Sequence, residues 1–181
     1  MAEADQRPIG SGFGRRSTAR EVLEGVDLSG RNYIVTGGYS GIGLETVKAL
    51  VEAAARVIVP ARAPVAAREA PADLPQVEVA EMDLADLASV RAFARYWLAR
   101  NRPLHGLVNN AGIMACPLTR VGPGWESQLA VNHLGHFELA RSLRPSLEAA
   151  GGARVIALSS TAHIISDVHW DDPHFRAHDY D

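Results

Sequence analysis

The hydrophobic positions of this chain follow two patterns that alternate along most of its length. Five short runs are rich in consecutive apolar or β-branched residues, which is typical of strands that are covered on both faces. These runs occupy residues 32–36, 57–59, 77–82, 104–108 and 155–158. Pro60 follows the second run directly and is expected to end it.

Between the runs, apolar residues recur at helical spacing. Residues 41–52 and 86–100 are predicted helices, and 125–150 is predicted as one long helix that Pro145 kinks or breaks. The apolar face expected for the first of these helices consists of Ile42, Val47, Ala49, Leu50 and Val51. Strands that alternate with helices predict an α/β fold with right-handed crossovers and a parallel sheet.

The two ends of the chain differ from this central part. Residues 1–30 are predicted to be a lead-in with alternating glycines and a short helix that starts at Ser17, its expected N-cap, and runs to Glu24. Residues 31–160 contain all five runs and form the predicted domain. Residues 161–181 form a polar tail without periodicity.

Composition narrows the class of protein. The 181 residues are 47% hydrophobic and 22% charged, which is typical of one soluble globular domain. A formal net charge of -3 argues against a general nucleic-acid binder. The apolar runs are much shorter than the roughly 20 residues of a membrane helix, and no signal peptide is readable. We therefore expect a cytoplasmic protein without nucleic-acid or membrane partners.

A glycine-rich loop joins the first predicted strand to the first predicted helix. It reads Thr-Gly-Gly-Tyr-Ser-Gly-Ile-Gly over residues 36–43. A pyrophosphate must approach the backbone amides at a helix N-terminus closely, and side chains there would block it. In this interpretation Gly37 permits the tight turn, Gly41 the close approach and Gly43 the packing of helix on strand. The alternative is a glycine turn without a ligand.

The spacing Thr-Gly-x-x-x-Gly-x-Gly resembles the cofactor loop of the short-chain dehydrogenase/reductase family. Further segments match this family in the same order: Asp83-Leu84, Asn109-Asn110-Ala111-Gly112, Asn132 and Ser159-Ser160. The resemblance covers residues 30–163. The sequence Asn-His-Leu-Gly-His-Phe, residues 132–137, is most similar to the retinol-dehydrogenase-like branch.

The resemblance implies a Rossmann-type doubly wound parallel sheet, with five strands present in the order 3-2-1-4-5 and the last strands of the family fold missing. It implies that residues 31–160 are an NAD(P)-binding domain and that the lineage transfers hydride between NADP(H) and an alcohol or carbonyl substrate. The matching cofactor-binding positions are Gly37, Tyr39, Ser40, Gly41, Ile42, Gly43, Asp83, Leu84, Asn110, Ala111 and Gly112, and Arg62 is added to them on the ground of its charge. Asn132 and Ser160 match two catalytic positions, of which the serine orients the substrate oxygen and the asparagine holds a water of the proton relay. Asp83 as a helix cap and Asn110 as a tie between strands are the structural alternatives.

The residues after the second strand bear on the choice of coenzyme. An acidic side chain there would accept the ribose hydroxyls of NAD and repel a 2′-phosphate. No acid is present in Pro60-Ala61-Arg62-Ala63, and Arg62 can pair with a phosphate. This favours NADP over NAD, which stays open because Arg62 in a solvated loop is the alternative interpretation.

The chain lacks the remaining part of the family's catalytic tetrad. The family places a Tyr-x-x-x-Lys pair on a helix after the serine, but Lys48 is the only lysine of this sequence. Tyr180 is the only tyrosine after Ser160, and we do not assign it as catalytic. The sequence therefore resembles a chain truncated before this helix. The alternative to an active enzyme is a catalytically inactive nucleotide-binding fragment, which we favour for this chain alone.

A missing neighbouring helix has expected consequences for packing. Leu129, Leu134, Phe137 and Leu139 would be less buried than in the family, and residues 155–158 would form an unprotected sheet edge. We therefore expect a homo-oligomer or an aggregation-prone chain.

Other reactive residues are interpreted as structural. His174 and His178 are spaced i, i+4 near two aspartates, but Pro173 argues against a helix there, so a solvated loop is favoured and no metal site is predicted. Cys116 has no adjacent base and is interpreted as a small apolar residue. His133 and His136 are interpreted as packing or surface residues.

Overall fold

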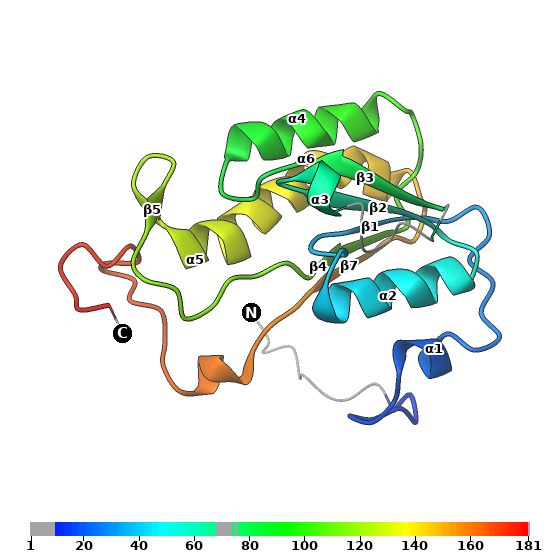
Figure 1. Ribbon diagram of the computed structural model, residues 1–181, viewed down its shortest axis with the longest axis horizontal. Helices are drawn as coiled ribbons and strands as arrows, with labels where there is room; N and C mark the ends of the chain where they lie inside the picture. The colour runs from blue at the N-terminus through cyan, green and yellow to red at the C-terminus, as the bar shows by residue number, and fades with distance from the viewer. Residues whose placement is uncertain (1–9, 68–73, 75, 181) are drawn as a thin grey trace.

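The computed structural model describes residues 10–67, 74 and 76–180, and it contains one parallel five-stranded sheet. The sheet has the order β3-β2-β1-β4-β7, which confirms the predicted order. Its strands are β3 (Val77–Glu81), β2 (Arg56–Ala61), β1 (Asn32–Val35), β4 (Gly106–Asn109) and β7 (Arg154–Ala157). Figure 1 shows α2 (Gly41–Glu52) on one face of the sheet and α4 (Leu87–Leu98) with α6 (Gly135–Glu148) on the other.

Alternation along the strands divides the core into two layers. Ile34, Ile58 and Leu107 face α4 and α6, whereas their neighbours Val35, Val57 and Val108 belong to the cluster that packs on α2. Each strand therefore needs apolar residues at consecutive positions, which is why the runs in the sequence are continuous. Trp97 on α4 is fully buried, and its Nε1–H donates to Ser146 Oγ at 2.8 Å.

Several predicted boundaries change for local reasons. Pro60 does not end β2, because it lies beyond Ile58, the last β2 residue that is paired with β1. Ile42 does not belong to the buried face of α2, since it is 74% exposed at the first turn. The short helix is α1 (Ala19–Val22), and Thr18 caps it in place of Ser17 through a capping box with Glu21.

The long helix predicted over 125–150 is four elements. It begins with β6 (Trp125–Glu126), which pairs with β5 (Arg120–Val121), and continues as α5 (Ser127–Leu129), the π-helix η1 (Ala130–Leu134) and α6. Glu126 ends the hairpin and caps α5 by accepting the amides of Gln128 and Leu129, both at 2.7 Å. Pro145 lies inside α6 without breaking it.

The expectation of weak burial on this segment is wrong in one position. Leu139 is fully buried against α4, because α4 already covers this face of α6. Phe137, on the same segment, is 63% exposed, as the expectation of weak burial predicted.

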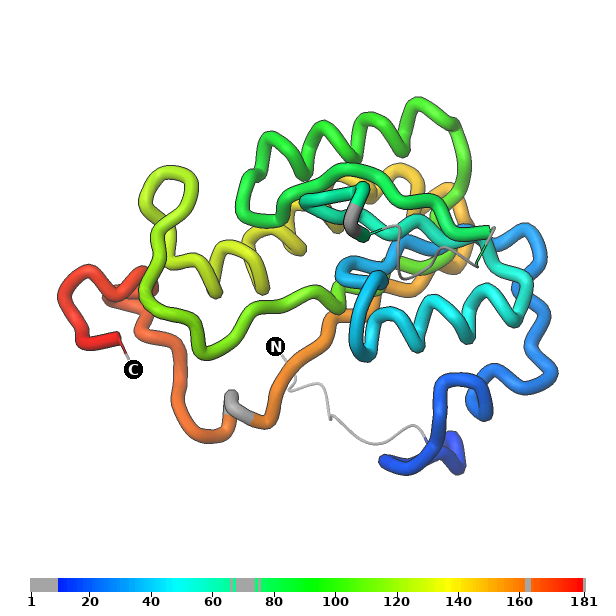
Figure 2. The backbone as a smooth tube through the Cα atoms, viewed as in Figure 1, coloured from blue at the N-terminus to red at the C-terminus, as the bar shows by residue number. Residues whose placement is uncertain are grey.

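The polar tail has more structure than its composition suggests. The remaining elements are α3 (Pro64–Ala67), between β2 and β3, and the 3₁₀ turn η2 (Thr161–Ile164), after β7. Beyond η2, residues 166–180 fold back onto the β5–β6 hairpin (Figure 2). Arg120 donates to the carbonyl groups of His174 and Phe175 at 2.6 and 2.8 Å. Asp172 accepts the three successive amides of residues 176–178.

β7 is the last strand of the sheet, and all four of its residues are exposed. Among the described residues, none of the helices combines the length and the apolar character needed to cross a membrane.

Glu138 connects the two helices on one face of the sheet. Its side chain is 7% exposed and accepts from Arg91 of α4 at 2.7 Å and from Arg141 at 2.8 Å. Hydrogen bonds from Arg141 are the largest cause that lowers the pKa of Glu138, to about 2. The folded chain therefore holds a proton on this carboxyl less readily than the unfolded chain does, so the pair stabilises the fold above pH 4.5 and this stability is lost as the pH falls towards 2.

We expect E138Q to lower the free energy of unfolding by about 1–2 kcal/mol at neutral pH, with both arginines half exposed to solvent screening. It should also flatten the acid limb of stability in urea melts recorded against pH. E148Q, which breaks the exposed pair with Arg144 on the same helix, is the matched control and should change stability by less than about 0.5 kcal/mol. Equal effects of the two variants would contradict this account.

Candidate functional site

Two adjoining cavities lie along the carboxyl edge of the sheet. The first is lined by Gly37, Tyr39, Arg62, Asp83 and Leu84 among the residues singled out in the sequence. The second is lined by Asn110, Asn132 and Ser160. Ala111 and Gly112 line both cavities. The structure thus brings ten of the fourteen proposed site residues to one groove, whereas Ser40, Gly41, Ile42 and Gly43 line neither cavity.

The glycine loop has backbone angles that favour glycine. Gly37 has a φ of +66° and Gly41 a φ of +51°, both in the left-handed region. A Cβ atom at Gly41 would meet nothing within 4 Å, so the space beside the first turn of α2 is open. Ser40 is the N-cap of α2, but its side chain makes no hydrogen bond to the first turn.

Two other glycines of the loop are needed for close packing. A Cβ atom at Gly43 would lie 2.4 Å from the Gly37 carbonyl oxygen and 2.5 Å from Asn110 Nδ2. Gly38, which the sequence analysis did not single out, has the same constraint, because its Cβ would lie 2.8 Å from Val47 Cγ2. The sequence signal that could have identified Gly38 is its position inside the glycine-rich loop, directly after Gly37.

The hydroxyl group of Thr36 joins the loop to the segment after β4. Thr36 Oγ1 accepts the amides of Asn110 and Ala111, both at 2.9 Å. The side-chain amide of Asn110 donates to the Thr36 carbonyl oxygen at 2.9 Å. Asn110 therefore ties the ends of β1 and β4 together in the described structure. This is the structural role that the sequence offered as the alternative to cofactor binding.

Asn132 lies in the π-helix η1 and holds the loop that lines both cavities. Its Oδ1 accepts the amide of Ile113 at 2.9 Å, and its Nδ2 donates to the Ile113 carbonyl oxygen at 2.8 Å. π-Helical turns inside longer helices are frequent at functional sites. Both Asn132 and Ser160 are exposed to the second cavity.

A buried histidine beside this asparagine was not predicted as a site residue from the sequence. His136 is 6% exposed, and burial is the main cause that lowers its pKa. Its ring lies between Thr36 Oγ1 and the Asn132 carbonyl oxygen, at 2.9 and 3.0 Å. The interpretation as a packing residue omitted these polar contacts, because helical spacing alone does not show what faces a side chain.

The two charged residues of the first cavity, Asp83 and Arg62, lie in different local settings. Asp83 Oδ1 accepts the amide of Ala85 at 2.9 Å, so Asp83 shapes the turn before α4, whereas Asp86 is the N-cap of that helix. Arg62 follows β2 directly and is exposed.

Asn109, the last residue of β4, lines the second cavity and is 7% exposed. Its Oδ1 is a buried acceptor without a hydrogen-bond partner in the described part of the chain. Buried acceptors are rarely left unpaired, so this atom marks a place where a donor group would be stabilised.

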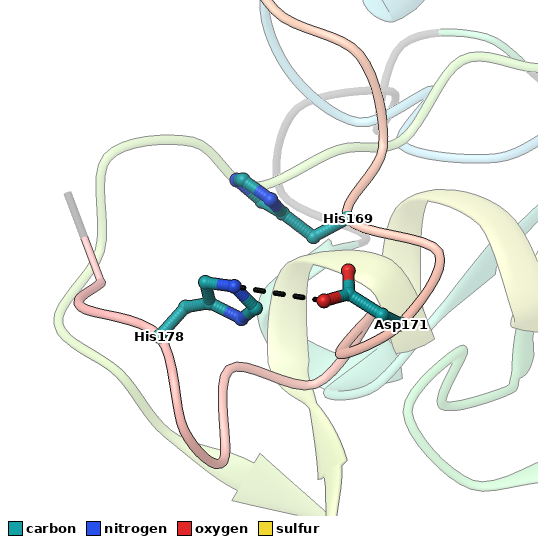
Figure 3. A group of neighbouring side chains, drawn as sticks. All are labelled: His169, Asp171 and His178. Carbon is teal, nitrogen blue, oxygen red and sulfur yellow. Dashed lines mark ion pairs between the residues drawn. The ribbon is translucent and has the colours of Figure 1, made fainter.

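A group of polar side chains lies in the C-terminal segment, away from the groove. His169, Asp171 and His178 have ligand-type atoms within 4.8 Å of one another, and His178 Nε2 lies 3.7 Å from Asp171 Oδ2 (Figure 3). The two imidazole rings are stacked at 22°. A metal ion lies in the plane of each imidazole that binds it, so rings stacked in this way do not direct their nitrogens at one ion. His174 faces the Glu126 amide instead.

Tyr180 is held in the same segment. Its hydroxyl group donates to Glu126 Oε1 at 2.9 Å and contacts the side-chain amide of Gln128, and burial is the largest cause that raises its pKa. Cys116 is partly buried, and its Sγ lies 3.9 Å from Ser127 Oγ.

A parallel sheet in this order, with a glycine loop after its first strand, defines an α/β protein of the Rossmann type. A family model described as short chain dehydrogenase matches residues 31–170. The chain therefore belongs to the short chain dehydrogenase family of oxidoreductases.

Curated relatives support this assignment. The chain is 47% identical over 162 residues to a probable oxidoreductase of Streptomyces lividans, which covers 86% of the chain and 54% of the relative. It is 43% identical over 153 residues to retinol dehydrogenase 12 of Bos taurus, covering 81% and 48%. The chain thus spans about half the length of the curated relatives it matches.

Solved structures agree with the fold. An uncharacterized protein from Mycobacterium Paratuberculosis superposes with a TM-score of 0.79 at 37% identity, over 91% of this chain and 57% of that one. The Pseudomonas aeruginosa RhlG/NADP active-site complex superposes with a TM-score of 0.66 at 32% identity, over 76% and 57%.

The loop geometry leads to a test by substitution. We expect G43A to lower the free energy of unfolding by about 1–3 kcal/mol, because the added methyl group meets backbone and cannot be accommodated by a rotamer change. G152A is the control, since that glycine has an ordinary φ and open space around it. Urea melts of both variants measure the difference. A G43A chain as stable as G152A would contradict the geometry.

Proposed function

We propose that this chain binds NADP(H) in the groove along the carboxyl edge of the sheet. The observation that carries the proposal is the opening beside the first turn of α2, where Gly41 leaves space and Ser40 leaves the turn uncapped by a side chain. Backbone amides at a helix N-terminus stabilise a phosphate group. In this proposal, residues 37–43 hold the pyrophosphate.

The two cavities fit the two ends of a dinucleotide. Arg62, Asp83 and Leu84 line the first, which would take the adenosine end. The second contains Asn132 and Ser160 and would take the nicotinamide end, with Asn109 Oδ1 as an unused acceptor for a donor group there. In this proposal the dinucleotide spans both cavities, which adjoin at Ala111 and Gly112.

Charge supports NADP(H) as the preferred form. Arg62 is exposed directly after β2, and residues 60–63 contain no acidic side chain that would repel a phosphate. An arginine makes charge-assisted hydrogen bonds to a phosphate that are stronger than those between neutral groups.

The proposed reaction class is hydride transfer between this coenzyme and an alcohol or carbonyl compound. When bound, the coenzyme supplies or accepts the hydride. Ser160 would orient the substrate oxygen, and Asn132 would hold the loop at Ile113 against the coenzyme.

A second candidate function is nucleotide binding without catalysis. The one tyrosine among residues 161–181 is Tyr180, and its hydroxyl group donates to Glu126 Oε1 outside the groove. Calorimetry with NADPH, together with NADPH consumption in the presence of a panel of aldehydes and ketones, separates the candidates. Binding with consumption supports the oxidoreductase, binding without consumption supports the second candidate, and no binding rejects both.

The role proposed for Arg62 predicts a change in coenzyme preference. We expect R62A to weaken NADPH binding about 10- to 100-fold, because the 2′-phosphate loses a charge-assisted partner, and to leave NADH binding within about threefold. Titration calorimetry measures both affinities. R95A removes an exposed arginine of α4 and is the charge-matched control, which should bind both coenzymes as the unmodified chain does. Equal losses for NADPH and NADH in R62A would contradict the assignment.

A further inference from the structure

His136 joins three segments that meet where the two cavities adjoin. It lies on α6, whereas Thr36 opens the glycine loop and Asn132 belongs to η1. The hydroxyl group of Thr36 also holds the amide of Ala111, which lines both cavities. One imidazole ring thus contacts, directly or through one hydroxyl group, the loop, the shared wall and the asparagine.

The hydrogen bonds assign one protonation state to this ring. The carbonyl oxygen of Asn132 only accepts, so Nδ1 must carry a proton. Thr36 Oγ1 already accepts two amides at 2.9 Å, so its hydroxyl proton is donated. Of its two acceptors, Nε2 is the nearer at 2.9 Å, and the Val108 carbonyl oxygen lies at 3.4 Å. The neutral imidazole with its proton on Nδ1 satisfies every partner. A protonated ring would place a second donor against a hydroxyl oxygen whose lone pairs are taken.

The surroundings of His136 favour this uncharged form. Burial lowers its pKa, the bond to Asn132 opposes this, and the charge of His133 lowers it further. The residue after β1 contributes the Thr36 hydroxyl group, β4 contributes the Val108 carbonyl oxygen, and the segment after β4 contributes backbone amides. None of these groups titrates in this range.

We propose that His136 is a positioning residue of the groove: its uncharged ring holds Thr36, the Ala111 wall and Asn132 in the one arrangement that binds the coenzyme. This inference rests on the proposed NADP(H) binding. It has a reciprocal consequence, because a ligand that requires the neutral ring must lower the pKa of that ring when it binds. The negative charge of the coenzyme alone would raise the pKa of a nearby histidine, so the sign of the change separates the two effects.

The direct test is an NMR titration of the histidine ring signals against pH, with and without saturating NADPH. We expect NADPH to lower the apparent pKa of His136 by about one unit, equivalent to a tenfold difference in affinity between the two protonation states. His105 is the internal control, because its pKa is also lowered by burial but it precedes β4, at the end of that strand remote from the groove. The signals are assigned with H136Q and H105Q. A raised or unchanged pKa of His136 would overturn the proposal.

A pair of variants tests the same point through affinity. H136Q retains one donor and one acceptor, whereas H136F keeps only an aromatic ring and leaves the Thr36 hydroxyl group only the Val108 carbonyl oxygen, at 3.4 Å, as an acceptor. At about pH 8 we expect H136Q to bind NADPH within about threefold of the unmodified chain and H136F to bind at least tenfold more weakly. Below about pH 6 the unmodified chain should lose affinity relative to H136Q. The 2′-phosphate titrates near pH 6 in every variant, so its contribution cancels in this ratio.

The outcomes distinguish the two proposals. If the unmodified chain does not bind NADPH at any pH, the proposed function fails. If it binds and H136F binds equally well, or the ratio to H136Q does not change with pH, the positioning role of His136 fails while the proposed function stands. If H136F does not fold, the NMR titration of the unmodified chain decides.

Discussion

The hydroxyl group of Thr36 is the contact on which the arrangement of the groove depends. It accepts two amides from the segment after β4 and bonds to a histidine of α6, so three elements far apart in the sequence are fixed at one atom. The position is 1% exposed, and a buried hydroxyl group must find partners for its proton and its lone pairs. The glycines that follow can turn closely over this point because they have no side chains.

The sequence predicted the sheet well and the segment after residue 115 poorly. Continuous apolar runs such as Val57-Ile58-Val59 were interpreted as strands that are covered on both faces. The order of the strands was predicted from the family resemblance, and the structure has that order. The β5–β6 hairpin has two residues in each strand, which is too short for any periodic pattern. Helical spacing also continued across η1, since a π-turn shifts the register of contacts without changing the type of residue. Leu139 is buried for a tertiary reason, the packing of α4, that local pattern does not contain.

The positions of the candidate site could be predicted from the sequence, but the hydrogen-bond partners of its residues could not. Arg62 could be named from its place after the second strand, because a loop after a parallel strand opens at the carboxyl edge of the sheet, and Asn132 could be named from the family resemblance. The partners of those residues could not be named. Thr36 and His136 are a hundred positions apart, and only the fold brings them within 2.9 Å. The same holds for Asn109, whose orphaned acceptor is visible only once its burial is known.

The central claim is that the backbone amides of the glycine loop hold the phosphates of a dinucleotide. A ¹⁵N–¹H correlation spectrum of the labelled chain, recorded during titration with NADPH, tests this directly, since it reports on each amide separately. The account predicts large saturable shifts for the amides of residues 37–43 and for Ala111 and Gly112, with the amides of the β5–β6 hairpin unchanged. Shifts confined to other surfaces, or no shifts at saturating NADPH, would contradict it.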